Sequence, residues 1–307
     1  MKFFNIKYID LNRRIDNWFF SNYKNVPKSL IYKIIRKGYV KINNSIVKPD
    51  YKLQINDKLD IIYNLFNKKK YSYIKYNDKE FIKNKILYED KYLLIINKPH
   101  GISVHNGLSN TFNIISYIKS VYNNNYNLVH RLDKNSSGIL IISKNLSILK
   151  KINFLFNENS IFKKYIALVY GAWNIKNNII RLPIHTFIDK ISKKKKSIIS
   201  NHLGKKSITK INVIKYFKDM TLIEAIPITG RTHQIRIHTS FIGNPIVMDN
   251  IYGNKNYNKI VLKYGLKRMF LHSTYIKFIH PIYNKVIEIN SPLDNKLSDF
   301  IKKISQL

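Results

Sequence analysis

Two short motifs in this sequence bring together residue types that can do acid–base or nucleophilic chemistry. The first runs His130-Arg-Leu-Asp-Lys-Asn-Ser-Ser-Gly138, between two apolar stretches. A carboxylate at a strand end, beside arginine, histidine and a glycine-containing turn, is placed to act as a nucleophile or a base. A surface loop with an ion pair between Arg131 and Asp133 would have the same sequence, so this motif alone is compatible with both interpretations.

The second motif runs Thr229-Gly-Arg-Thr-His-Gln-Ile-Arg-Ile-His238. On a helix, His233, Arg236 and Ile237 would share one side, which would let Arg236 point into a site. His233 and His238 are five residues apart, a poor spacing for two ligands on one helical face, and no acidic residue lies between them. We therefore expect no metal site here.

A third motif, Lys163-Lys-Tyr-Ile-Ala-Leu-Val-Tyr-Gly171, is either an ordinary strand or a strand that presents Tyr165 as a platform for stacking a base. The sequence has neither Gly-x-Gly-x-x-Gly nor the Gly-Lys-Ser/Thr phosphate loop. We therefore expect chemistry that uses neither ATP nor a dinucleotide.

The composition indicates a polyanionic partner. The 307 residues include 54 Lys and Arg against 18 Asp and Glu, a net charge of +36, which suits nucleic acid or an anionic membrane surface. Part of this charge reflects a general bias toward Ile, Lys and Asn, but three of the eight arginines fall within the first two motifs, where a forked, always-charged donor is useful. The apolar content of 45% argues against disorder, and the absence of cysteine excludes disulfides and thiolate metal sites.

No apolar run approaches the ~20 residues that span a bilayer. The chain also begins without the long apolar stretch of a secretory signal. We expect a soluble, cytoplasmic protein that does not engage a membrane.

Residues 12–62 are predicted to form a small module. Asp16 is expected to cap a helix over Asn17–Tyr23, and a second helix, Pro27–Lys37, is expected to stop at Gly38. Short strands should follow at Tyr39–Asn43, Ile46–Lys48 and Lys58–Ile62. The second helix has an apolar face and a polar face formed by Ser29, Lys33, Arg36 and Lys37. That polar face either docks on phosphates or is merely solvated.

Residues 63–84 are polar and basic and are predicted to be a linker, with a larger domain over 85–307. Strands and helices interleave there without a regular βαβ repeat, which favours a mixed-sheet α+β fold. Strands are expected at Tyr92–Asn97, Leu128–Leu132, Gly138–Ser143, Lys164–Val169, Thr221–Pro227, Tyr275–Ile279 and Val286–Ile289. Helices are expected at Thr111–Val121, Ser147–Phe156 and Arg231–Phe241.

The first two motifs together resemble those of the pseudouridine synthases that modify ribosomal RNA. Further segments also fit that family: Ile86–Asp90, Asn97–His105, Tyr165–Gly171, Asn244–Ile246 with Asp249 and Tyr252–Gly253, and Arg268–His272. Residues 12–62 resemble the S4-type RNA-binding module, and Val26–Gly38 is similar to the C-type subgroup that acts on large-subunit rRNA. Ser136 departs from the pattern, where threonine is commoner, and Ser197–Lys206 is difficult to align.

The resemblance implies an S4-type domain followed by an α+β catalytic domain with a largely antiparallel sheet, and a monomer without metal or cofactor. It implies that Asp133 is the catalytic carboxylate, that Arg131 helps evert the target nucleotide, that Tyr165 stacks on the flipped uracil and that Arg236 pairs with Asp133. The implied reaction isomerises several uridines of 23S ribosomal RNA to pseudouridine. Whether Asp133 forms a sugar adduct, adds to the base or moves a proton stays open.

Two other functions fit part of the sequence. A non-catalytic RNA-binding or ribosome-assembly protein would account for the charge and for residues 12–62, but not for Arg131, Asp133 and Arg236 together. A basic nuclease would also bind RNA, but the sequence lacks paired histidines or a carboxylate cluster suited to strand cleavage.

Overall fold

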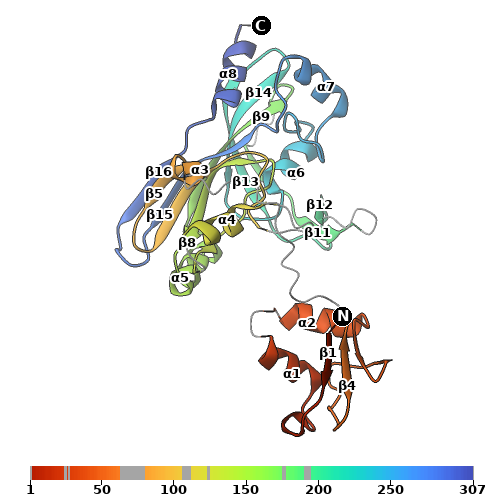
Figure 1. Cartoon of the computed structure of the whole chain (residues 1–307). Coiled ribbons are helices and arrows are strands. Elements are labelled where there is room, and N and C mark those ends of the chain that lie inside the picture. The colour runs from red at the N-terminus through yellow and green to blue at the C-terminus, as the bar shows by residue number, and fades with distance from the viewer. Residues whose placement is uncertain are drawn as a thin grey trace. The chain divides into compact units, whose positions relative to one another are not determined.

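A computed structural model describes residues 2–23, 26, 28–62, 80–105, 112–122, 125–174, 178–189 and 195–306. The chain forms two compact units, Met1–Tyr73 and Ile74–Leu307, which are described separately (Figure 1). Most of the predicted linker, residues 63–79, lies outside the described residues. Its last part was assigned wrongly, because Glu80–Lys83 form helix α3, whose Ile82 is fully buried in the core of the second unit.

The first unit packs two helices against a small antiparallel sheet with the strand order β1-β4-β2-β3. Its first strand, β1, precedes the predicted start of the module at residue 12 and pairs with β4. The elements in chain order are β1 (Lys2–Asn5), the short helix η1 (Tyr8–Asp10), α1 (Ile15–Asn22), α2 (Lys28–Arg36), β2 (Val40–Ile42), β3 (Ser45–Ile46) and β4 (Lys58–Ile61).

Asp16 does not cap the first helix as predicted. Helix α1 begins at Ile15, so Asp16 lies inside its first turn, where its buried carboxylate accepts a 2.8 Å hydrogen bond from the Arg14 guanidinium and one from the Asn17 N–H. The capping position is occupied by Arg14, whose side chain makes no capping hydrogen bond. Asp16 thus pairs with Arg14 across the start of the helix.

The two-faced character of the second helix is confirmed. Ile31, Ile34 and Ile35 of α2 are buried against the sheet, while the side chains that the sequence placed on the other face are all exposed: Ser29, Lys33, Arg36 and Lys37. The chain turns out of the helix at Gly38, whose φ of +72° is unfavourable for residues with a Cβ.

The second unit is built on a mixed sheet of ten described strands in the order β10-β13-β14-β9-β15-β8-β6-β5, with β16 beside β15 and β7 beside β8. All its pairings are antiparallel except β8 with β15, which confirms the predicted α+β class. The strands are β5 (Ile86–Glu89), β6 (Leu93–Lys98), β7 (Asn127–Leu128), β8 (Ser137–Ser143), β9 (Phe162–Tyr170), β10 (Ile179–Arg181), β13 (Ile208–Tyr216), β14 (Met220–Pro227), β15 (Leu271–Ile279) and β16 (Val286–Asn290).

Helices cover both faces of this sheet, because side chains alternate along each strand. In β8, Leu140 and Ile142 pack with α3 and α4, whereas Ile139 and Ile141 pack with α5. Farther along the sheet, α6 contributes to one core cluster, and α7 and α8 contribute to another (Figure 1). These helices are α4 (Ile114–Val121), α5 (Leu146–Asn157), α6 (Gln234–Phe241), α7 (Lys255–Lys263) and α8 (Asn295–Ile304).

Some predicted elements have different bounds in the structure, and one hairpin was not predicted. The strand expected at Leu128–Leu132 ends at Leu128, because the His130 ring accepts the Ile141 N–H at 3.0 Å, where a strand would have used a carbonyl. The helix expected at Thr111–Val121 begins at Ile114 and is capped by Asn113. A hairpin that the sequence did not predict, β11 (Ile184–Ile188) with β12 (Lys195–Ile199), includes the start of the segment that was difficult to align.

The helix expected at Arg231–Phe241 begins only at Gln234. The Gln234 side-chain carbonyl accepts hydrogen bonds from the Arg231 N–H and the Thr229 hydroxyl, which folds residues 229–233 into a loop instead of a first helical turn. In the part of the chain that the structure describes, no helix is both long and apolar enough to span a bilayer.

Candidate active site

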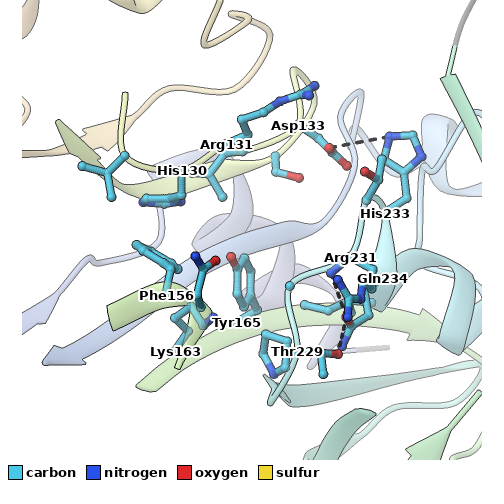
Figure 2. A pocket seen from close by; sticks show the side chains of 18 of the residues that line it. His130, Arg131, Asp133, Phe156, Lys163, Tyr165, Thr229, Arg231, His233 and Gln234 are labelled. Carbon is cyan, nitrogen blue, oxygen red and sulfur yellow. Dashed lines mark hydrogen bonds and ion pairs between the residues drawn. The ribbon is translucent and has the colours of Figure 1, made fainter. Parts of the chain in front are cut away.

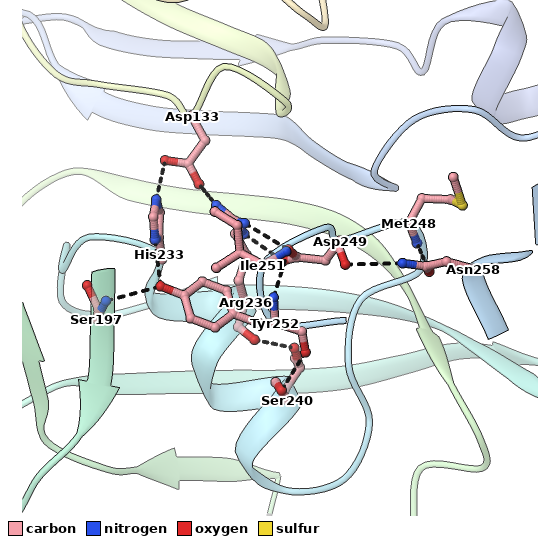
Figure 3. Close-up of polar contacts among 11 residues, drawn as sticks. Asp133, Ser197, His233, Arg236, Ser240, Met248, Asp249, Ile251, Tyr252 and Asn258 are labelled. Atoms are coloured by element: carbon pink, nitrogen blue, oxygen red, sulfur yellow. Dashed lines mark hydrogen bonds and ion pairs between the residues drawn. The ribbon is translucent and has the colours of Figure 1, made fainter. Parts of the chain in front are cut away.

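Asp133 lies in the loop that leads into β8, and its carboxylate is held by Arg236 of α6. The Arg236 Nη1 donates to Asp133 Oδ2 at 2.8 Å, although 103 residues separate the two in sequence (Figure 3). The opposite edge of the same guanidinium donates from Nε and Nη2 to the two oxygens of Asp249, at 2.7 and 2.8 Å. Arg236 therefore bridges two carboxylates, a geometry that suits a planar fork and not an ammonium.

Burial sets the charge states around this bridge. Burial would raise the pKa of Asp249, but the hydrogen bonds and charge of Arg236 outweigh it and hold that pKa below its usual range. The pKa of Arg236 is raised, because its two carboxylate partners outweigh the cost of burial. Only 4% of the Arg236 side chain and 1% of the Asp249 side chain are exposed, against 29% for Asp133, so the Asp133 carboxylate is the one open to a ligand.

His233 contacts the other oxygen of Asp133. Its Nε2 lies 3.6 Å from Asp133 Oδ1, and its Nδ1 lies 2.8 Å from the Tyr252 hydroxyl (Figure 3). Burial lowers the pKa of His233, while the Asp133 carboxylate acts in the opposite direction. The Tyr252 hydroxyl also accepts the Ser197 N–H at 3.2 Å, which ties hairpin β11–β12 to this side of the site.

The Asp249 turn is fixed by its own contacts. Asp249 Oδ1 accepts the N–H groups of Ile251 and Tyr252, and the Asn258 amide on α7 donates to the Asp249 carbonyl at 3.2 Å (Figure 3). Asn258 also accepts the Met248 N–H at 2.8 Å. These bonds fix the carboxylate that orients Arg236 before any ligand arrives.

A buried polar network holds the Asp133 loop where it joins β8. The Ser137 hydroxyl lies 2.8 Å from His272 Nδ1 and accepts a hydrogen bond from Arg268, which also pairs with Asp294 at the start of α8. Because His272 Nε2 faces the Ser291 carbonyl at 3.1 Å, that nitrogen carries the proton and Nδ1 accepts from Ser137. Burial, with the Arg268 charge, lowers the pKa of His272 to about 4, so the ring is neutral.

The segment around Lys98 holds the loop from a second side. The Gly101 N–H donates to the Lys134 carbonyl at 2.8 Å. Lys98 is fully buried and donates to the carbonyls of Pro99 and Ile102, which fixes the turn that presents Gly101. Burial and the nearby Arg268 lower the pKa of Lys98 to about 7, with Asp133 acting in the opposite direction.

Close packing of β8 on β15 fixes the distance between the Asp133 loop and Tyr165. Gly138 has a φ of +107°, and a Cβ there would lie 2.2 Å from the Ser273 carbonyl oxygen, so only glycine fits. Ser273 also pairs in register with Tyr165 of β9 and hydrogen-bonds with its hydroxyl. Burial raises the pKa of Tyr165 to about 12, so its phenol stays protonated at neutral pH.

Asp133, His233 and Tyr165 border a cavity of about 550 Å³ (Figure 2). Asp133 and His233 lie at one end and His130, Phe156 and Lys163 at the other, with Tyr165 between them. Sites for drug-sized molecules typically have volumes of ~300–1,000 Å³, so the cavity exceeds the needs of a single pyrimidine ring. One carboxylate, fixed by a guanidinium and open to such a cavity, can act as a base or a nucleophile.

The sequence-predicted site residues do not all converge on one point. Asp133 and Tyr165 line the cavity, and Arg236 hydrogen-bonds to Asp133 without lining the cavity itself. Arg131 also lines it, but its side chain is exposed and has no hydrogen-bond or ion-pair partner within the described ranges. Ser29, Lys33, Arg36 and Lys37 belong to the first unit and are no part of this cavity.

No group of three or more potential ligands that could hold a metal ion is found within the described ranges. His238, one of the two histidines considered for such a site, is fully buried and surrounded by hydrogen-bond partners. Its Nδ1 lies 2.9 Å from the Thr209 hydroxyl, and its Nε2 lies 3.0 Å from both the Ser207 hydroxyl and the Leu182 carbonyl. His238 therefore anchors α6 to β13.

Sequence reasoning missed the part that Asp249 and Tyr252 play. Both were noted as matching the family pattern, but neither was given a contact. The available signal was Arg236 itself, because a buried guanidinium that serves one partly exposed carboxylate needs a second, buried counter-charge. His233 was weighed only as a metal ligand and instead contacts Asp133.

The fold and the cavity define an α+β enzyme whose site presents one open carboxylate. Comparison with known proteins names its family. Residues 92–241 match the RNA pseudouridylate synthase family model, and residues 13–59 match the S4 domain. Two solved human structures share the fold. Human RNA Pseudouridylate Synthase Domain Containing 4 has a TM-score of 0.60 and 23% identity, with coverage of 74% of this chain and 95% of that one. Human RNA Pseudouridylate Synthase Domain Containing 1 has a TM-score of 0.58 and 23% identity, with coverage of 70% of this chain and 86% of that one.

Curated relatives match nearly the whole chain. A protein of Pasteurella multocida is 36% identical over 98% of this chain and 93% of its own length, and one of Buchnera aphidicola (Acyrthosiphon pisum) is 40% identical over 96% and 94%. Both relatives are named ribosomal large subunit pseudouridine synthase C. The chain belongs to the RNA pseudouridylate synthase family, as an RNA pseudouridine synthase with an N-terminal S4 domain.

Proposed function

We propose that this enzyme isomerises several uridines of large-subunit (23S) ribosomal RNA to pseudouridine and that Asp133 performs the chemistry. The observation that carries the assignment is that Asp133, which lines one end of a cavity also lined by Tyr165, pairs with Arg236. The substrate follows from the relatives named for the large ribosomal subunit and from the S4 domain.

The reaction balances without a co-substrate. The bond from N1 to C1′ breaks, the uracil turns, a bond from C5 to C1′ forms, the C5 proton leaves and N1 gains a proton. A carboxylate can serve this sequence by attacking the sugar, by adding to the base or by removing a proton. In each case it must be held in one orientation within reach of the substrate. Arg236 fixes Asp133 Oδ2 at 2.8 Å, and Oδ1 lies 3.6 Å from His233 Nε2.

Binding must first take the uridine out of its stack, which costs a few kcal/mol. Tyr165, half-buried on β9, offers an aromatic surface for the everted base. Arg131, exposed at the rim and without a partner in the described part of the chain, is placed to enter the vacated stack or contact its phosphates. The exposed face of α2 adds a sequence-tolerant attraction for the RNA backbone.

The test is release of tritium from C5 of labelled uridine in 23S rRNA fragments. Asp133→Asn preserves the shape but removes the charge, so tritium release should vanish while RNA affinity changes little. Asp299→Asn is the matched control, because Asp299 is 68% exposed on α8. Turnover by Asp133→Asn near the wild-type rate would overturn the assignment, and mapping pseudouridines in rRNA from a complemented deletion strain would identify the targets.

A further inference from the structure

The end of the cavity away from Asp133 contains a cation that the proposed chemistry does not use. Lys163 of β9 lies at this end together with His130 and Phe156 (Figure 2). Asn153 and Asn157, which also line the cavity, belong to the same helix as Phe156. Its ammonium lies 5.2 Å from the centre of the Phe156 ring, and the His130 ring lies 5.2 Å from the same centre. Phe156 is thus close to both side chains, with the Lys163 ammonium over its ring.

Lys163 has no anionic partner among the described residues. It is half-buried, and burial lowers the pKa of its ammonium. The neighbouring His130 ring is neutral and supplies no negative charge, because burial, with the charge of Lys163, lowers its pKa to about 3, and its Nε2 accepts the Ile141 N–H. The positive charge at this end of the cavity is therefore not balanced by the protein.

The neighbouring lysine on the same strand, by contrast, has a carboxylate partner. Lys164, on the opposite face of the same strand, pairs with Glu224 at 3.0 Å. A desolvated cation without a counter-charge is costly, and that cost is offset when a bound anion supplies the missing charge. A protein that binds a polyanion has such an anion in every nucleotide.

We propose that Lys163 binds a backbone phosphate adjacent to the target nucleotide, so that the cavity holds the uridine at its Asp133 end and a flanking phosphate at its Lys163 end. The amides of Asn153 and Asn157, on the face of α5 that borders the cavity, supply further donors. The cavity volume of about 550 Å³ leaves room for both groups. This inference rests on the proposed function, because it takes the ligand to be RNA.

The experiment combines a protein change with a change in a single phosphate. Affinity is measured over a range of salt concentrations for wild type, Lys163→Gln, Lys163→Arg and, as the matched control, Lys164→Gln. The RNA is a short 23S fragment in which each phosphate flanking the target is replaced, one at a time, by an uncharged methylphosphonate. Melting temperatures establish that each variant is folded. If Lys163→Gln does not fold, Lys163→Met replaces it, because methionine keeps an unbranched apolar side chain at this position.

We expect Lys163→Gln to weaken binding about 10-fold, the typical loss of one charge-assisted hydrogen bond. Its salt dependence should become shallower by about one unit in the log–log slope, whereas Lys163→Arg retains most of the affinity. One methylphosphonate position should weaken wild type and Lys164→Gln but leave Lys163→Gln unaffected. Equal sensitivity of wild type and Lys163→Gln at every position would overturn the proposal.

Failure of this inference is distinguishable from failure of the proposed function. The affinity measurement does not depend on turnover and can be repeated on Asp133→Asn. If wild type releases no tritium from 23S fragments, the substrate assignment fails, but the affinities of wild type and Lys163→Gln for methylphosphonate RNA still decide whether Lys163 binds a phosphate. If tritium is released and every methylphosphonate affects both proteins equally, only the phosphate site is wrong.

Discussion

The two ends of the cavity treat charge in opposite ways. At one end Asp133, Arg236 and Asp249 form a continuous set of ion pairs at 2.7–2.8 Å, with His233 beside it. At the other end Lys163 is half-buried beside a neutral His130 and the Phe156 ring, and none of the carboxylates in the described part of the chain pairs with it. Both ends border the same cavity.

Under the proposed function, this difference separates groups arranged for chemistry from a group arranged for binding. A catalytic carboxylate must hold one orientation in the free enzyme, and ion pairs made within the protein provide that preorganisation. A cation that is to attract a ligand must leave its charge unbalanced until the ligand arrives. Breaking pairs at the first end should therefore damage stability and rate, and changing the second end should damage affinity.

The largest effect is expected from Asp249→Ala. This change leaves the buried Arg236 with only the partly exposed Asp133 as a partner, and breaking a buried pair costs ~3–5 kcal/mol of unfolding free energy. Denaturant unfolding measures this loss, with Asp299→Ala on the exposed side of α8 as the control. A loss no larger than that of the control would show that Asp249 does not hold the guanidinium.

The next effect is expected from Arg236→Lys. Lysine keeps the charge but lacks the planar guanidinium whose Nε, Nη1 and Nη2 reach both carboxylates at once. Single-turnover tritium release should therefore fall ~10²-fold, which corresponds to about 2.7 kcal/mol of activation barrier. Arg181→Lys, at an exposed position on β10, is the matched control. Wild-type turnover by Arg236→Lys would mean that the fork is not needed.

A smaller, pH-dependent effect is expected from the network beneath the Asp133 loop. The pKa of His272 is lowered from 6.5 to about 4, so between these values the unfolded chain binds a proton that the folded chain does not. Folding stability should therefore fall as the pH drops from 6.5 toward 4.

The variant His272→Gln should flatten this part of the stability–pH curve, measured by denaturant unfolding at several pH values. The exposed His202→Gln is the control and should leave the curve unchanged in shape. An unaltered slope in His272→Gln would show that this ring does not contribute to acid instability.

The smallest effect on chemistry is expected from α2. Lys33→Gln and Lys37→Gln remove exposed charges from its polar face, so each should make the salt dependence of rRNA binding shallower by about one unit. The rate at saturating RNA should stay at the wild-type value, because neither residue lines the cavity. Unchanged salt slopes would place the RNA-binding surface elsewhere.

Local patterns predicted many of the elements, although not the hairpin β11–β12, and tertiary contacts decided where several of the predicted ones begin or end. The apolar spacing of Ile31, Ile34 and Ile35 was enough to predict α2, because amphipathic periodicity is a local property. The start of α6 could not be predicted, because it depends on the Gln234 side chain accepting the Arg231 N–H within a folded loop. The same holds for the early end of β7, which depends on His130 meeting Ile141.

The candidate site divides in the same way. Asp133 and Arg236 stand in specific motifs, and the resemblance to a family implied their contact. Asp249 has no motif of its own and acts through burial against Arg236, while the unbalanced charge of Lys163 becomes visible only when its neighbours are known. Residue type can suggest chemistry, but the balance of charge requires the fold.

One measurement tests the division of labour within the cavity most directly: the affinity and the saturating single-turnover rate of Asp133→Asn and Lys163→Gln, measured side by side on one 23S fragment. Asp133→Asn should lose tritium release and keep its affinity. Lys163→Gln should lose affinity about 10-fold and lose far less of its rate than Asp133→Asn does. Tritium release by Asp133→Asn near the wild-type rate would contradict the account, because the paired carboxylate would then not be the group that performs the reaction.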